Sequence, residues 1–192
     1  MNKHAAIVRA EPHLLFRSTP ARFTSEEFMR MAEAGAFEDM KIELVNGEIE
    51  RMNPPMSNHT VRVSRLSEVL APAARAAGLF ALGETGIDIG GDTVRACDAA
   101  LVRRIPDENR LFGADDIILA IEVAETTRAR DMGPKRTDYA SIGIENYWVV
   151  DGARSVVHVF GEPVDGDYAQ VHTVRFGEPL AVPGTNATII ID

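Results

Sequence analysis

The chain has 192 residues, of which 45% are hydrophobic and 26% charged, and these values are typical of one globular domain with its own core. Its formal net charge of -9 argues against a protein that coats nucleic acid by charge alone, although it leaves room for a local basic patch. The single cysteine, Cys97, excludes an internal disulfide and a cysteine zinc site, and it favours a reducing cytoplasm. No apolar run approaches the roughly 20 residues that span a bilayer, so we expect a cytoplasmic protein without a membrane partner.

The first half of the chain predicts two helices and a hairpin. Residues 1–22 lack periodicity, and we expect them to be a lead-in to a single domain over residues 23–192. Thr24 and Glu27 have the spacing of a capping box, which predicts a helix beginning there. The pair Asn46-Gly47, flanked by alternating apolar residues, predicts a type I′ hairpin. A long amphipathic helix is expected to follow and to end at Gly78.

The second half predicts short strands around one helix. Strands are expected at 79–84 and 85–89 and from Thr93 onward, and the very apolar segment 115–123 is expected at the centre of the sheet. Residues 133–143 predict a helix with Pro134 in its first turn. The remainder of the chain is rich in β patterns, with no internal repeat or linker. Together these elements predict an α/β domain with a β-rich C-terminal end.

Three carboxylates are expected on one face of the hairpin. A two-residue turn places Glu43 opposite Glu50, and alternation puts both on the same side as Glu48. Such a cluster is self-repelling unless water or a cation screens it. The face is either a solvated surface helped by Lys41 or an acidic wall beside a metal, and the sequence leaves both readings open.

Two apolar strands each carry one further carboxylate. Asp98 is expected at the start of its strand and Glu122 near the end of the central strand. Taken singly, an Asp at a strand start is often a turn or cap residue. Taken together, the two residues match the one or two carboxylates with which proteins usually hold Mg²⁺.

A basic segment follows the central strand and supplies Arg128, Arg130, Lys135 and Arg136. The ordinary reading is a solvated loop, and the alternative is a local patch that contacts phosphate. Side chains on a helix lean toward its N-terminus, so Lys135 is expected to point back toward Glu122. His59 opens the long helix, where a phosphate could bind, although a lone histidine there is often structural.

The chain contains an ordered series of short strings: IELVNGEI, ACDAALV, and IEV followed by TT, KR, DYA and NYWVVD. In this series the chain resembles the Uma-type, restriction-endonuclease-like family of the PD-(D/E)xK nuclease superfamily. This resemblance implies a mixed β-sheet flanked by helices and an endonuclease that uses Mg²⁺, with Mn²⁺ as a substitute. It implies that Asp98 and Glu122 bind the metal, that Lys135 assists the attacking water, and that Glu43 is an additional acidic residue of the site.

The sequence departs from the superfamily pattern at three places. Cys97 stands where the motif has proline, and Ala124 stands where it has lysine; the resemblance to the Uma-type pattern implies that Lys135, on the following helix, takes the place of that lysine. Glu125 and Thr126 replace the family's Ser-Pro after the glutamate strand. This last replacement bears on the geometry of the loop more than on the metal ligands.

We therefore expect a metal-dependent endonuclease that hydrolyses nucleic-acid phosphodiesters, with DNA favoured over RNA as the partner. The expected catalytic residues are Asp98, Glu122, Lys135 and Glu43, and the expected substrate-binding residues are His59, Arg128 and Arg130. Alternatives are a nucleic-acid-binding module without turnover and a protein-interaction module whose acidic face recruits a partner. A homodimer is left open.

Overall fold

Helices and strands follow one another in the mixed order that the sequence predicts, and a computed structural model describes residues 19–192. The expected lead-in, residues 1–22, lies almost entirely outside the described residues, so the division at residue 22 stays a prediction. The helices are α1 (Ser25–Glu33), α2 (Ser57–Ala76), α3 (Arg128–Arg130) and α4 (Arg136–Ser141). The strands are β1 (Ile42–Val45), β2 (Glu48–Arg51), β3 (Phe80–Gly90), β4 (Thr93–Val102), β5 (Ile117–Ala124), β6 (Asn146–Asp151), β7 (Val156–Val164), β8 (Asp167–Arg175), β9 (Pro179–Ala181) and β10 (Thr188–Ile190).

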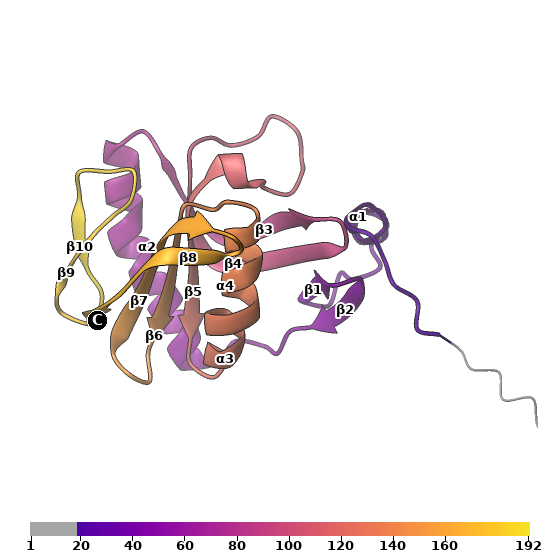
Figure 1. Cartoon of the computed structure of the whole chain (residues 1–192), viewed down its shortest axis with the longest axis horizontal. Coiled ribbons are helices and arrows are strands. Elements are labelled where there is room, and N and C mark those ends of the chain that lie inside the picture. Colours follow the sequence, from indigo (N-terminus) through magenta and orange to yellow (C-terminus); the bar gives the residue numbers. More distant parts are fainter. Residues whose placement is uncertain (1–18) are drawn as a thin grey trace, which may run out of the picture.

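One large mixed sheet organises the domain, with strand order β2-β1-β4-β5-β6-β7-β8 and β3 also paired with β4 (Figure 1). β5 and β6 are parallel, whereas the other neighbouring strands of this sheet are antiparallel. Every residue of β5 is buried, which explains its continuous apolar composition. The prediction of a central strand here is confirmed.

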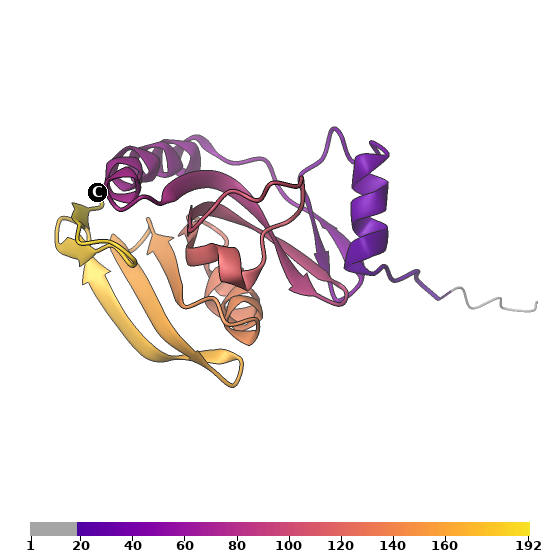
Figure 2. The same cartoon turned by 90° about the horizontal axis from the view of Figure 1, so that it is seen from above.

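Helices cover both faces of the sheet (Figure 2). On one face α2 contributes Leu66 and Leu70 to a core that includes Trp148 of β6. On the other face α4 contributes Tyr139, whose ring packs edge-on against Tyr147 with 5.2 Å between centroids. The central strands are therefore shielded from water on both sides. Within residues 19–192 no helix is long and apolar enough to cross a membrane.

Local signals in the first half of the chain are confirmed. Thr24 caps α1, and Glu27 completes the capping box by accepting from the Thr24 backbone. The hairpin has the expected register, with Val45 opposite Glu48 and Glu43 opposite Glu50. Asn46 has a positive φ of 49°, as a type I′ turn requires.

Three element boundaries differ from the expectations. The two short strands at 79–84 and 85–89 are a single strand, β3, because continuous pairing with β4 carries it through an irregular, positive-φ residue at Glu84. Asp98 consequently lies in the middle of β4 and not at its start.

The segment after β5 is helical from Arg128 to Ser141, so the expected basic loop is wrong. Its middle, Asp131–Lys135, is a π-helical turn that contains Pro134. Proline lacks the N–H that an α-helix interior needs, and such wide single turns are a common way to accommodate an irregularity.

Candidate active site

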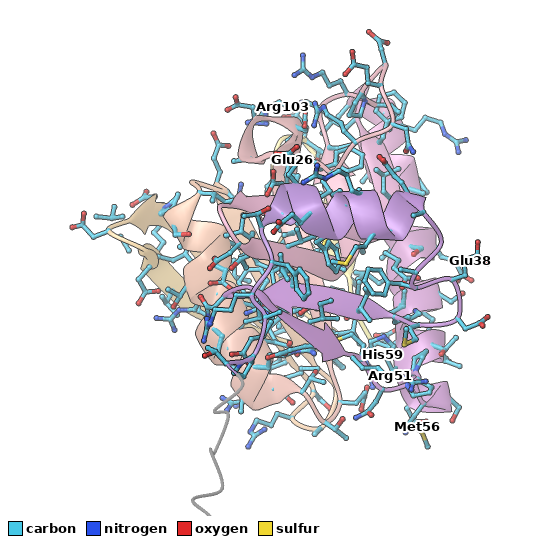
Figure 3. The ribbon with its side chains drawn as sticks, turned by 90° about the vertical axis from the view of Figure 1, so that its right-hand side faces the viewer. Glu26, Glu38, Arg51, Met56, His59 and Arg103 are labelled. Carbon is cyan, nitrogen blue, oxygen red and sulfur yellow. The ribbon has the colours of Figure 1, made fainter. Side chains whose placement is uncertain are left out.

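A cavity of about 760 Å³ opens where β1, β4 and β5 meet the N-terminal end of α2. Six of the seven predicted site residues line it: Glu43, His59, Asp98, Glu122, Arg130 and Lys135. Figure 3 labels His59 and three further residues of the cavity wall, Glu38, Arg51 and Met56, and shows the four gathered on one side of the molecule. Arg128 is the predicted site residue that does not line the cavity.

Adjacent strands bring the two predicted metal ligands together. β4 and β5 pair Ala99 with Ile121, and the same register continued by one residue makes Asp98 and Glu122 cross-strand neighbours. The carboxylate of Asp98 also reaches the β5 backbone, where Oδ2 accepts from the Val123 N–H at 2.7 Å. Asp98 is therefore held in place by the strand that carries Glu122.

Glu122 is nearly inaccessible to solvent, with 2% of its surface exposed. Its Oε1 accepts from Lys135 Nζ at 2.8 Å and from the Tyr139 hydroxyl at 3.0 Å. Burial raises the pKa of Glu122 to about 8, because the attraction of Lys135 offsets only part of the lost hydration. Both contacts are to Oε1, so Oε2 is the atom with capacity for a further ligand.

Lys135 uses all three of its ammonium donors inside the protein. Nζ contacts the Ala96 carbonyl at 2.7 Å, Glu122 Oε1 at 2.8 Å and Glu43 Oε1 at 2.9 Å. Burial lowers the pKa of Lys135, but the two carboxylates outweigh burial and hold this pKa above its ordinary value. The ammonium is thus a buried cation that bridges two carboxylates, as its expected direction toward Glu122 predicts.

Glu43 is buried, unlike its hairpin neighbours Glu48 and Glu50. Its Oε2 accepts from Arg95 Nη1 at 2.9 Å, and Oε1 accepts from the Ala96 N–H at 3.2 Å. Burial opposes ionisation, yet Lys135 and Arg95 together hold the pKa of Glu43 below its ordinary value. Neither a solvated face nor a fully acidic wall describes the hairpin, since one carboxylate is neutralised inside the site and two are exposed.

Sequence reasoning missed Arg95. Its side chain is 2% exposed and joins Glu43 to Asp138, the latter by an Nε hydrogen bond of 2.7 Å. An arginine three residues before Asp98, in a strand otherwise apolar, is the signal that could have found it, because a buried guanidinium requires partners.

His59 lies between Asp98 and the end of β5. Its Nδ1 is 3.0 Å from the Val123 carbonyl, and its Nε2 is 3.3 Å from Asp98 Oδ1. Both ring nitrogens face acceptors, so the doubly protonated imidazolium satisfies both contacts. The hydrogen bond to Asp98 accordingly raises the pKa of His59, against the opposing effect of burial. Its expected contact with phosphate stays a prediction.

The basic residues after β5 are mostly engaged with carboxylates. Arg128 Nε contacts Asp151 Oδ2 at 3.0 Å, and Arg136 Nε contacts Asp167 at 2.7 Å. Arg130 Nε also contacts a carboxylate, Asp131 Oδ1 at 3.4 Å, but its Nη1 contacts only the weakly accepting sulfur of Met52, at 3.0 Å. Among these arginines, Arg130 is the one in the cavity wall, and its guanidinium has donors with capacity for a ligand.

Asp98 and Glu122 line this cavity, and Val123, the residue after Glu122 in β5, has a carbonyl oxygen that contacts His59 of the same wall; hard divalent cations prefer oxygens of these kinds. In the part of the chain that the structure describes, no three His, Cys, Asp or Glu side chains form a complete metal cage. The arrangement suits Mg²⁺ better than a caged metal, since Mg²⁺ usually takes one or two carboxylates and completes its shell with water and phosphate.

A family model described as "Putative restriction endonuclease", Uma2, matches residues 25–189. The chain belongs to the Uma2 family. A solved structure from Anabaena variabilis ATCC 29413, titled a "putative nuclease belonging to DUF820", is similar at 20% identity and a TM-score of 0.65. That similarity covers 88% of this chain and 95% of the other, and it supports the fold. No curated protein matches the chain.

Membership in the Uma2 family confirms the resemblance seen in the sequence motifs and supports a nuclease function with a nucleic-acid substrate. The sheet flanked by helices confirms the expected restriction-endonuclease-like fold class. Cys97, which replaces the motif proline, is 1% exposed and packs in the core beneath the site, where burial raises the pKa of its thiol.

Proposed function

We propose that this Uma2 protein is a Mg²⁺-dependent endonuclease that hydrolyses nucleic-acid phosphodiester bonds, with Mn²⁺ as a substitute metal and DNA as the favoured substrate. One observation carries the proposal: Asp98 and Glu122 are cross-strand neighbours in a cavity wall, and a buried lysine is bonded to Glu122. Two adjacent carboxylates can bind a metal ion that activates water, and a lysine beside them can stabilise negative charge, so these three groups are sufficient for metal-assisted attack of water on phosphate.

Asp98 and Glu122 would hold the metal, with help from the Val123 carbonyl. The donor set fits such an ion, because both hydrogen bonds to the buried Glu122 carboxylate go to Oε1, which leaves Oε2 for a cation, and burial raises the pKa of this group. Once bound, the ion would lower the pKa of a water molecule and polarise the phosphate. His59 contacts two of the same oxygens, so it would release or share them.

The roles of the protein's own residues follow from their contacts. Lys135 holds Glu122 and Glu43 in position. It can donate to a water molecule or to a phosphate oxygen only by releasing one of its three present acceptors. Arg130 is the proposed phosphate-binding cation, since its guanidinium faces the cavity with a thioether as its Nη1 partner. Once freed from Asp98, the imidazolium of His59 is a second donor for phosphate.

The test combines metal binding with cleavage. Wild type, Asp98→Asn and Glu122→Gln are titrated with Mn²⁺ by calorimetry and incubated with duplex DNA, single-stranded DNA and RNA in the presence of Mg²⁺. We expect both substitutions to weaken Mn²⁺ binding strongly and to abolish cleavage. Glu50→Gln is the matched control, because Glu50 is an exposed carboxylate of β2, and it should behave as wild type. Equal Mn²⁺ affinity in wild type and Asp98→Asn would refute the shared site.

A second candidate is a nucleic-acid-binding module on the same fold without turnover. It is favoured by one specific observation, the full use of the Lys135 donors within the protein, which leaves none for water. Metal-dependent nucleic-acid binding by a wild type that cleaves no substrate would support this candidate. An interaction protein whose acidic face recruits a partner would need no divalent ion at all.

A further inference from the structure

Strand β8 forms one outer edge of the large sheet, and Figure 2 shows no other described element beyond it. Most of its side chains are exposed, and 56% of the surface of Val171, at the middle of the strand, is accessible. From Tyr168 to Val174 the sequence YAQVHTV contains no Lys, Arg, Asp, Glu or Pro. This strand is therefore long and exposed, and its middle lacks the charges and proline that commonly block pairing at a sheet edge.

The opposite edge of the same sheet shows the contrast. β2 is only four residues long, all exposed, and three of them are charged: Glu48, Glu50 and Arg51. A free edge presents unpaired N–H and C=O groups, and proteins commonly block it with short strands, charges, proline or bulges. β2 has such protection, whereas the middle of β8 has none.

We propose that two copies of this chain pair through β8, in an antiparallel arrangement about a two-fold axis through Val171. In a regular antiparallel pair, two directly opposed residues either both point their N–H and C=O groups toward the other strand or both point them away from it. For two identical strands this condition places the two-fold axis on a residue and not between residues. The register that pairs all nine residues of β8 is then centred on Val171.

This register is complementary in charge. It places Asp167, at one end of β8, opposite Arg175 of the second copy, and symmetry repeats the pair at the other end. Arg175 has no ion-pair partner of its own within residues 19–192, whereas Asp167 is 52% exposed and already contacts Arg136. Shifting the register by one step in either direction separates Asp167 from Arg175. Charges at the two ends would therefore fix the register, and the uncharged middle would supply the pairing.

The proposed dimer is independent of the nuclease proposal. In the described chain no residue of β8 lines the cavity that holds Asp98 and Glu122, so pairing leaves the cavity open. Failure of one proposal would thus leave the other standing.

The first test uses the symmetry itself. Because Val171 faces its own copy across the axis, Val171→Cys should form an intermolecular disulfide under mild oxidation, seen as a dimer on a non-reducing gel. Val164→Cys is the matched control, because Val164 is equally exposed at 56% on the same hairpin but lies away from the axis. Cys97 is 1% exposed and does not compete. Cross-linking of Val164→Cys to the same extent would indicate random collision and overturn the proposal.

The second test measures mass in solution by sedimentation velocity over a range of concentrations. Wild type and Val164→Lys should both move from 20.9 kDa toward twice that mass, whereas Val171→Lys should remain monomeric. Arg175→Glu should weaken the dimer at least several-fold, because it opposes Asp167 with a like charge. A wild type that stays monomeric at every concentration, or a Val171→Lys variant that dimerises as wild type does, would overturn the proposal.

Discussion

Lys135→Met is expected to reduce the free energy of unfolding by about 3–5 kcal/mol at neutral pH, the usual cost of breaking a buried ion pair from one side. Lys135 is 1% exposed, and its ammonium lies within 3 Å of Glu122 and Glu43, at 2.8 and 2.9 Å. Methionine keeps most of the side-chain volume, so the loss measures the uncompensated carboxylates more than a cavity.

The pH dependence of this loss has a definite sign. The pKa of Lys135 is raised in the folded protein, so its contribution is fully present below the pKa of an unfolded lysine, about 10.4, and is lost only above it. The pKa of Glu43 is lowered, so its contribution exists above the unfolded value of about 4.3 and is lost as the pH falls. Without Lys135, the Glu122 pKa of about 8 rises further. The cost of the substitution should therefore grow in two steps: in the acid range, where Glu43 ionises, and again above about pH 8, where Glu122 ionises in wild type but stays protonated in the variant.

Urea denaturation followed by circular dichroism at several pH values measures this difference. Lys41→Met is the matched control, because Lys41 contacts Glu84 at 2.7 Å on the surface, where both side chains are at least half exposed. A surface pair of this kind contributes about 0–1 kcal/mol, so the control should lose little at any pH. Equal losses for Lys135→Met and Lys41→Met would refute the argument that burial makes the Lys135 contacts important.

Two further outcomes are expected from the charged residues around the domain. In a filter-binding titration, the slope of log affinity against log salt concentration should correspond to about two to four phosphate contacts. Arg130→Gln should reduce this slope by about one, whereas Arg128→Gln should leave it unchanged, because Arg130 lines the cavity and Arg128 does not. A slope near ten would contradict a local basic patch. Asp116→Asn should cost about 1–3 kcal/mol at pH 7, because Asp116 is 2% exposed and accepts from both Arg104 and Arg110. These arginines hold the Asp116 pKa below its ordinary value, so the stability that Asp116 contributes is present above about pH 4 and is lost as the pH falls. Urea denaturation that gives the same difference between variant and wild type at pH 3 and pH 7 would contradict a stabilising role of the Asp116 carboxylate.

Local chemistry made much of the fold predictable. The pair Asn46-Gly47 determines its own turn, and the turn determines the register, so Glu43 and Glu50 are opposed as expected. The capping box at Thr24 is likewise a contact between residues three apart. The apolar run of β5 predicts burial on both faces, and such a strand belongs at the centre of the sheet.

Long-range contacts were less accessible to sequence reasoning. The residues Arg95 and Glu43 are 52 positions apart, and no local pattern shows that one neutralises the other. The sequence predicts that the helix after β5 begins only near Gly133, because glycine and proline usually interrupt helices. In the structure the helical segment runs from Arg128 to Ser141 and passes through Gly133 and Pro134, because Lys135 and Tyr139 on it are buried against the sheet. Tertiary burial overrides propensity at this place.

The buried charges beneath the cavity alternate in sign. Arg95 contacts Glu43, Glu43 contacts Lys135, and Lys135 contacts Glu122, so each interior charge has opposite charges beside it. The alternation ends at Glu122, which has a cation on one side only, and the next carboxylate is that of Asp98. His59 compensates Asp98 through a contact at the edge of the cavity, where a competing cation can reach the same oxygens. The imbalance of charge is thus located at the Glu122–Asp98 end of the row, and a divalent ion bound there would complete the alternation. This is the physical reason why the proposed metal should prefer Asp98 and Glu122 to Glu43, although all three carboxylates share one cavity wall.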